Sequence, residues 1–120
     1  MKRILPVVLV LSLIITAFAP QPVEGLLPTR LKVTVIDELG NVQEGAVVKL
    51  YLSEEDYRKE TNETAGPEVT DKKGVVKFND LKPQQYYIYV EKGEMRNDGA
   101  GVLTAPLEEG KMNKVNVVIY

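Results

Sequence analysis

The short stretch Tyr86-Tyr87-Ile88-Tyr89-Val90 holds three of the six tyrosines of the chain, and these are the side chains best suited to contact a partner. Side chains alternate between the two faces of a strand, so Tyr87 and Tyr89 share one face and the other three residues share the opposite one. An exposed pair of tyrosine rings can stack on a sugar or fill part of a protein interface. Ordinary cross-strand pairing on the outside of a sheet produces the same pattern. Tyr87 and Tyr89 therefore form the candidate partner-binding face, with plain packing as the alternative interpretation.

The sequence offers few groups for catalysis. It contains no histidine and no cysteine, which excludes histidine-based triads, Cys–His pairs and imidazole acid–base designs. Beyond the amino-terminal segment the one serine is Ser53, and the acidic residues after it favour a helix N-cap over a nucleophile. Paired carboxylates for glycoside hydrolysis are compatible with the many acidic residues, but these lie in predicted turns and on solvated faces. We predict that the protein is not an enzyme and has no cofactor.

Oxygen-bearing side chains that could bind Ca²⁺ are scattered over separate predicted turns. The candidates are Asp37, Glu38 and Asn41 in one turn, Asp71 in another, and Asn97 with Asp98 in a Gly-rich loop. The D-x-D-x-D-G spacing of a calcium-binding loop is absent. We predict no metal site, and a small carbohydrate- or calcium-dependent enzyme stays as the lesser alternative.

Residues 1–25 have the pattern of a secretory signal peptide with its joint to a mature domain. Lys2 and Arg3 precede an uncharged, mostly apolar run over residues 4–19, which ends in a small-x-small triplet. The exact cleavage point stays open. An uncleaved membrane anchor is the alternative, but the run is shorter than the roughly 20 residues a span needs. We predict a domain over residues 26–120 that is secreted, periplasmic or extracellular, with no stable membrane insertion after signal removal.

The charge balance narrows the class of partner. The chain carries 15 Lys and Arg against 17 Asp and Glu, for a net charge of −2. A mildly acidic surface argues against nonspecific nucleic-acid binding, which needs a basic face. The absence of cysteine also means that the domain has no disulfide and must hold by packing. We expect a protein or carbohydrate partner and no nucleic acid.

Beyond residue 25, apolar residues recur with a period of two, which indicates strands. In the first predicted strand, Leu31, Val33 and Val35 share one face. In the second, the inward residues are Ala46, Val48, Leu50 and Leu52, and the outward residues are Val47, Lys49 and Tyr51. Segment 53–67 is charged and has no apolar stripe, which predicts a solvent-exposed connection between strands with one or two helical turns at most.

The rest of the chain continues the strand pattern. Segments 68–70 and 75–78 flank the turn at Asp71–Gly74 and predict a hairpin. The strongest strand is 86–90, because β-branched and aromatic residues suit a pleated surface. A long loop over 91–110, with a short strand near Val102-Leu103, leads to a final strand over 114–120. About seven strands with frequent turns and no long helix predict an all-β antiparallel sandwich.

Four pieces of sequence follow one another in a specific order. They are the turn at Gly40, the strand Gly45–Leu50, the segment Thr70–Phe78 and the corner Leu81–Val90. This order resembles the carboxypeptidase regulatory-like and Cna-B-type domains, which share the prealbumin-like (transthyretin-like) sandwich. Gln85 departs from the family pattern, which usually has Gly before the corner tyrosine. The resemblance implies a prealbumin-like fold, a bacterial source and a role in binding or support.

Cna-B-type domains also form an internal Lys–Asn or Lys–Asp isopeptide bond promoted by a buried acid. The position that the resemblance implies for the lysine holds Val35, and the position for the acid holds Val90. Lys32 and Glu91 lie nearby, but on the opposite strand parity, so they should face solvent. Asn116 then reads as an ordinary outward residue. We expect no isopeptide bond.

These observations together predict an exported, non-catalytic binding or accessory module. A purely structural or adhesive spacer domain is the main alternative. A contiguous aromatic surface around Tyr87 and Tyr89 would favour binding, and a featureless charged surface would favour the spacer.

Overall fold

A computed structural model describes residues 27–98 and 102–120 of the chain. The segments in these ranges are β1 (Thr29–Asp37), β2 (Val47–Tyr51), α2 (Glu54–Lys59), β3 (Ala65–Val69), β4 (Val75–Leu81), β5 (Tyr87–Lys92), β6 (Met95–Arg96) and β7 (Met112–Ile119). The predicted signal peptide lies outside the described residues. None of the helices within them is long and apolar enough to cross a membrane.

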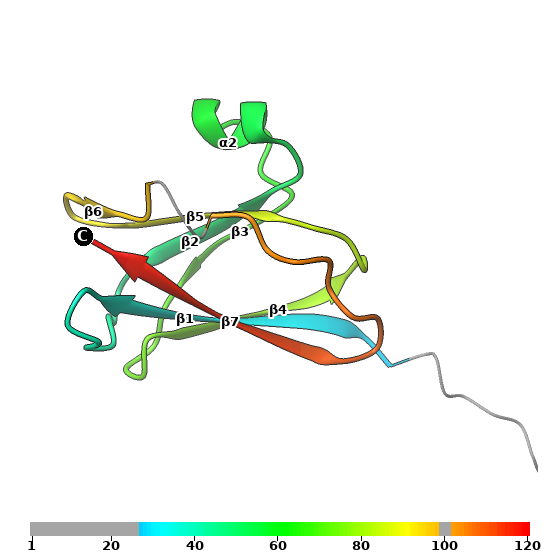
Figure 1. Ribbon diagram of the computed structural model, residues 1–120, viewed down its shortest axis with the longest axis horizontal. Helices are drawn as coiled ribbons and strands as arrows, with labels where there is room; N and C mark the ends of the chain where they lie inside the picture. The colour runs from blue at the N-terminus through cyan, green and yellow to red at the C-terminus, as the bar shows by residue number, and fades with distance from the viewer. Residues whose placement is uncertain (1–26, 99–101) are drawn as a thin grey trace, which may run out of the picture.

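The seven strands of the described residues form two sheets packed face to face (Figure 1). One sheet has three strands in the order β4-β1-β7, and the other has four in the order β3-β2-β5-β6. Helix α2 lies on the outer side of the four-stranded sheet, whereas the outer side of the three-stranded sheet carries no described element. The prediction of an all-β sandwich with about seven strands is confirmed.

The sequence led us to expect an antiparallel sandwich, but one pair of neighbouring strands is parallel. Strands β1 and β7 run parallel, with Arg30 opposite Met112 and Asp37 opposite Ile119. The segment before β7 returns the chain to the end of the sandwich where β1 begins, and the Arg30 amide donates to the Lys111 carbonyl at 2.9 Å. The first and last strands therefore start side by side and run in the same direction.

The predicted hairpin around Asp71–Gly74 is wrong, although its turn is correct. Strand β3 pairs with β2 and strand β4 pairs with β1, so the two strands belong to different sheets. The Asp71 carboxylate accepts hydrogen bonds from the amides of Lys73 (2.8 Å) and Val75 (3.0 Å). Gly74 has a φ of 76°, which glycine adopts without strain. The turn is thus a corner between the sheets, and these amides lower the pKa of Asp71.

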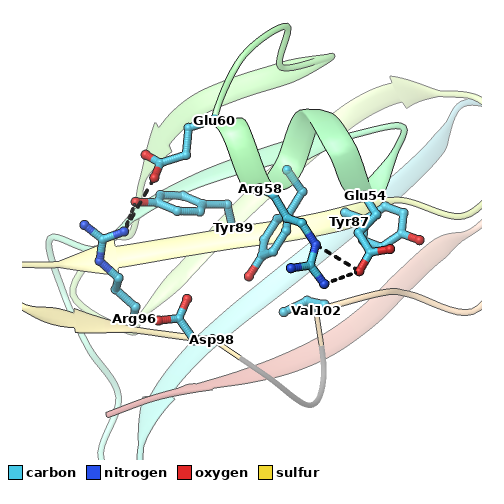
Figure 2. A pocket seen from close by; sticks show the side chains of 9 residues that line it. Glu54, Arg58, Glu60, Tyr87, Tyr89, Arg96, Asp98 and Val102 are labelled. Carbon is cyan, nitrogen blue, oxygen red and sulfur yellow. Dashed lines mark hydrogen bonds and ion pairs between the residues drawn. The ribbon is translucent and has the colours of Figure 1, made fainter.

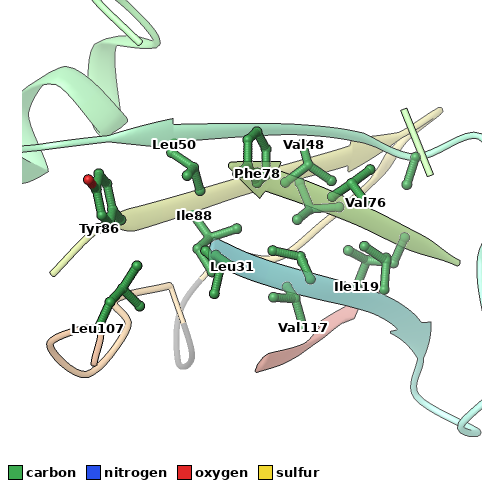
Figure 3. Packing of buried hydrophobic residues seen from close by; sticks show 14 residues of the cluster. Leu31, Val48, Leu50, Val76, Phe78, Tyr86, Ile88, Leu107, Val117 and Ile119 are labelled. Carbon is green, nitrogen blue, oxygen red and sulfur yellow. The ribbon is translucent and has the colours of Figure 1, made fainter. Parts of the chain in front are cut away.

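The core lies between the sheets and follows the predicted parity closely. Figure 3 shows side chains of both sheets meeting there, with Leu31 and Val117 on one sheet and Leu50 and Ile88 on the other. The Tyr86 ring is buried at one end of the core. Its hydroxyl accepts a hydrogen bond from the Lys82 amide at 3.0 Å, as a tyrosine does at the corner of a sandwich.

The positions discussed for an isopeptide bond follow the same parity. Val35 and Val90 are both fully buried. Asn116 is exposed, as expected of an outward residue. The core at this level is therefore hydrocarbon.

The prediction for the end of β2 is wrong for Leu52, which was expected inside and is 52 % exposed. Tyr51 faces outward as predicted, but it is fully buried. The strand ends at Tyr51, and Ser53 starts α2 by accepting a hydrogen bond from the Asp56 amide at 3.1 Å, as its N-cap pattern predicted. The helix then covers the outward ring of Tyr51. The connection also ends earlier than expected, because Ala65 already pairs with Leu50 in β3.

Candidate functional site

Four tyrosines gather on the outer face of the four-stranded sheet, beneath α2. Tyr57 is the one aromatic residue of the otherwise charged α2. Because burying its ring is favourable, α2 packs on β2 and β5 with Tyr57 facing the sheet. Its ring centroid lies 6.2 Å from Tyr51, 6.1 Å from Tyr87 and 6.1 Å from Tyr89. The rings of Tyr51 and Tyr89 meet edge to face at 6.5 Å. Such contacts stabilise aromatic pairs beyond the area that they bury.

Tyr89 is a packing residue of this cluster and not an exposed one. It is 4 % exposed, so the expectation that both Tyr87 and Tyr89 face solvent is wrong for Tyr89. Its hydroxyl accepts a hydrogen bond from Arg96 (3.0 Å) and donates one to Glu91 (3.2 Å), while α2 covers the ring. Burial raises the pKa of Tyr89, and the neighbouring carboxylate of Glu60 raises it further. The hydroxyl therefore stays neutral and joins β5 to β6.

Tyr87 is half-buried, and its ring is available together with that of Tyr57. Their ring planes are tilted by 34°. The accessible aromatic pair is thus Tyr57 with Tyr87, in place of Tyr87 with Tyr89. Sequence reasoning missed Tyr57 as a site residue, although it is the lone aromatic four residues after a recognised N-cap. That spacing is the signal that could have identified it.

These two rings line a pocket of about 490 Å³ between α2, β5 and the segments on either side of residues 99–101. Its lining residues are Glu54, Tyr57, Arg58, Glu60, Tyr87, Tyr89, Arg96, Asp98 and Val102 (Figure 2). The volume lies within the range of small-molecule sites in proteins, roughly 300–1,000 Å³. The pocket thus combines an aromatic wall with a charged rim.

The charged rim consists of ion pairs. On one side Arg58 contacts Glu54 at 2.7 Å. On the other, Arg96 contacts Glu91 at 2.9 Å and Glu60 at 3.6 Å. The second group is tied to the aromatic cluster, because the guanidinium of Arg96 lies 5.8 Å from the centre of the Tyr89 ring. The rim therefore presents hydrogen-bond donors and acceptors around the aromatic wall.

Asp98 lines the same pocket on the side opposite α2 (Figure 2). Burial raises the pKa of Tyr57, and the negative charge of Asp98 raises it further. The hydroxyl of Tyr57 is thus neutral near pH 7 and can donate a hydrogen bond.

The calcium candidates from the sequence are not brought together. The Asp37 carboxylate accepts from the amides of Leu39 and Asn41, both at 2.9 Å, and so closes its own turn. Asn97 is buried, and its side chain accepts from the Val90 amide at 3.0 Å. In the described ranges no group of three or more acidic residues gathers as a metal site would require.

Comparisons with known proteins identify no family for this chain. No protein-family model matches the sequence, and no curated protein is significantly similar to it. The structure is similar to BcpA, the major pilin subunit of Bacillus cereus, with 19% identity and a TM-score of 0.46, over 78% of this chain and 30% of that one. It is also similar to chlorocatechol 1,2-dioxygenase from Pseudomonas putida, with 16% identity and a TM-score of 0.44, over 78% of this chain and 60% of that one. The chain spans less than two thirds of either protein.

Proposed function

We propose that this chain is an exported, non-catalytic binding module and that the pocket under α2 holds a short carbohydrate. The observation that carries the proposal is the half-open pair of Tyr57 and Tyr87 rings inside a pocket with a charged rim. A sugar ring has an apolar face of C–H groups that packs on an aromatic ring, and hydroxyls that pair with carboxylates and guanidinium groups. The pocket offers both kinds of contact at once.

The charged rim suits binding better than catalysis. Glu54 and Glu60 each lie beside an arginine, so the rim presents hydrogen-bond acceptors next to donors. Glycoside hydrolysis needs a second, protonated carboxyl group across the scissile bond. The chain also has no histidine or cysteine to act as base or nucleophile. These features support a binding role.

The export part of the proposal rests on the basic start and apolar run over residues 2–19. The resemblance of residues 31–90 to carboxypeptidase regulatory-like and Cna-B-type domains agrees with a module that acts outside the cell. Fractionation of cells that express the chain tests this part separately. Recovery of the uncleaved chain in the cytoplasm would contradict it.

The binding part is tested by screening the purified chain against an array of neutral oligosaccharides and measuring Kd for the best ligand by calorimetry. We expect Tyr57→Ala and Tyr87→Ala each to weaken binding by roughly 5- to 30-fold, because loss of one stacked ring costs on the order of 1–2 kcal/mol.

The matched controls are Tyr57→Phe and Tyr87→Phe, which keep the rings and should keep most of the affinity. Circular dichroism checks that each variant is folded at the temperature of the assay, because Tyr57→Ala also removes contacts with Tyr51 and Tyr89 and should lower the melting temperature. If the wild type binds no saccharide, or if the alanine variants bind as well as it does, the pocket is not a sugar site. The spacer alternative would then be favoured.

A further inference from the structure

The outer face of the three-stranded sheet carries a row of three lysines. Lys32 on β1 stands directly opposite Lys77 on β4 and directly opposite Lys114 on β7. Leu31 and Val33, the neighbours of Lys32 in β1, are buried, so the alternation of the strand turns Lys32 outward. Both partner lysines are exposed. The three ammonium groups thus belong to one transverse line across the sheet.

This arrangement is unfavourable for the isolated domain. Like charges directly opposite one another on neighbouring strands destabilise a sheet. Carboxylates do not relieve the repulsion, since none of the ion pairs of the described residues includes any of these lysines. Asp71 senses the charge of Lys77 from the corner turn without pairing with it. A charge row that costs stability and has no ion-pair partner among the described residues is complementary to an external anion.

The outward rows on one side of the lysines hold no charge. Thr34 pairs with Val75 and Asn116, and Ile36 pairs with Val118. A chain with a net charge of −2 thus carries a local row of positive charge on this face. No described element covers it, since α2 lies on the other sheet (Figure 1).

The spacing fits a linear polymer. Neighbouring strands lie about 4.8 Å apart, so the three lysine positions span roughly 10 Å across the sheet. Arg30 stands two residues before Lys32 on the same side of β1, about 7 Å along the strand. We propose that this lysine row binds a linear acidic polysaccharide, with carboxylates on successive sugars opposite Lys77, Lys32 and Lys114. The proposal is independent of the pocket under α2, which lies on the other sheet.

The composition of the face favours an acidic polysaccharide over other polyanions. Single-stranded nucleic acids bind by stacking their bases on aromatic side chains. Membrane-surface elements insert Trp, Phe or Leu between lipids. The rows through Lys32, Thr34 and Ile36 contain none of these residues. Lysine provides point charges that pair with single carboxylates.

The test measures binding of the full chain to polygalacturonate, with neutral dextran, single-stranded DNA and phosphatidylglycerol vesicles as parallel probes. We expect binding to polygalacturonate at 50 mM NaCl and a loss of more than tenfold at 500 mM, because salt screens exposed charges. The double variant Lys32→Gln/Lys114→Gln should bind at least tenfold more weakly. Its melting temperature should stay the same or rise, since the substitution removes repulsion.

Two matched variants separate position from charge. Lys32→Arg/Lys114→Arg keeps the charges and should keep the binding. Lys59→Gln/Lys72→Gln removes two charges from α2 and from the corner turn and should bind as the wild type does. The proposal is overturned if the wild type does not bind polygalacturonate or if both glutamine variants bind equally well. Lysine-dependent binding to DNA or vesicles in place of the polysaccharide would also overturn it.

Discussion

The two sheets bury their inner faces against each other in the same way, but their outer faces differ. The four-stranded sheet is covered by α2, and its outward tyrosines and charges are paired with one another. No described element covers the three-stranded sheet, which carries three lysines in direct opposition. On the first face the outward residues contribute to folding. On the second face the three lysines repel one another and slightly destabilise the fold. The comparison therefore predicts opposite effects when outward residues of the two faces are replaced.

The largest effect is expected under α2. Tyr89→Ala removes a buried ring that contacts Tyr51 and Tyr57, and the cavity should lower the free energy of unfolding by about 3 kcal/mol. Urea unfolding followed by circular dichroism measures this value. Tyr89→Phe keeps the ring and removes only the hydroxyl bonded to Arg96 and Glu91, so it should lose about 1 kcal/mol. Equal and small losses in both variants would mean that the ring is not packed as described.

A smaller effect is expected from the helix that makes the two faces different. Ser53→Ala removes the N-cap of α2 and should cost about 1 kcal/mol. Because the helix has only six residues, the loss should appear as faster amide exchange over Glu54–Glu60, with the strand amides unchanged. Ser53→Asp keeps an oxygen at the cap and should keep the protection. Uniform exchange in the alanine variant and the wild type would show that packing alone holds α2.

The inner faces were predictable because strand parity is local. Leu31, Val33 and Val35 were placed inward because they alternate with Lys32 and Thr34. Ile88 and Val90 were placed inward because aliphatic residues alternate with tyrosines there. Which sheet a strand joins is not local information. The corner at Asp71 has the residues of a tight turn whether it closes a hairpin or passes the chain between sheets. The direction of β7 beside β1 depends on the long connection before it, and this connection has no hydrophobic periodicity from which its path could be predicted.

The outer faces were harder to predict, for two separate reasons. Tyr87 was identified from parity, but the burial of Tyr89 and Tyr51 depends on α2 folding back. The lone Tyr57 indicates which side of this helix packs, but no residue indicates where on the sheet it docks. The lysine row depends on register between strands far apart in the chain. Lys32, Lys77 and Lys114 become neighbours only when β4, β1 and β7 pair, so no local pattern contains the row.

The smallest expected effect compares one lysine on each face. Lys32→Gln removes the central charge of the row and should raise the free energy of unfolding by about 0.3 kcal/mol, because it relieves two like-charge contacts. Lys49→Gln removes an ammonium that lies 5.7 Å from the centre of the Tyr89 ring and should lower it by about 0.5 kcal/mol.

The two substitutions are chemically identical, so the sign of the change reports the face and not the residue type. Urea unfolding at 20 mM and 500 mM NaCl separates the causes, since screening should abolish the gain at Lys32. The loss at Lys49 should persist in part, because that side chain also packs on the ring. Two losses of equal size at low salt would show that the lysine row is not repulsive, and the contrast between the outer faces would then rest on α2 alone.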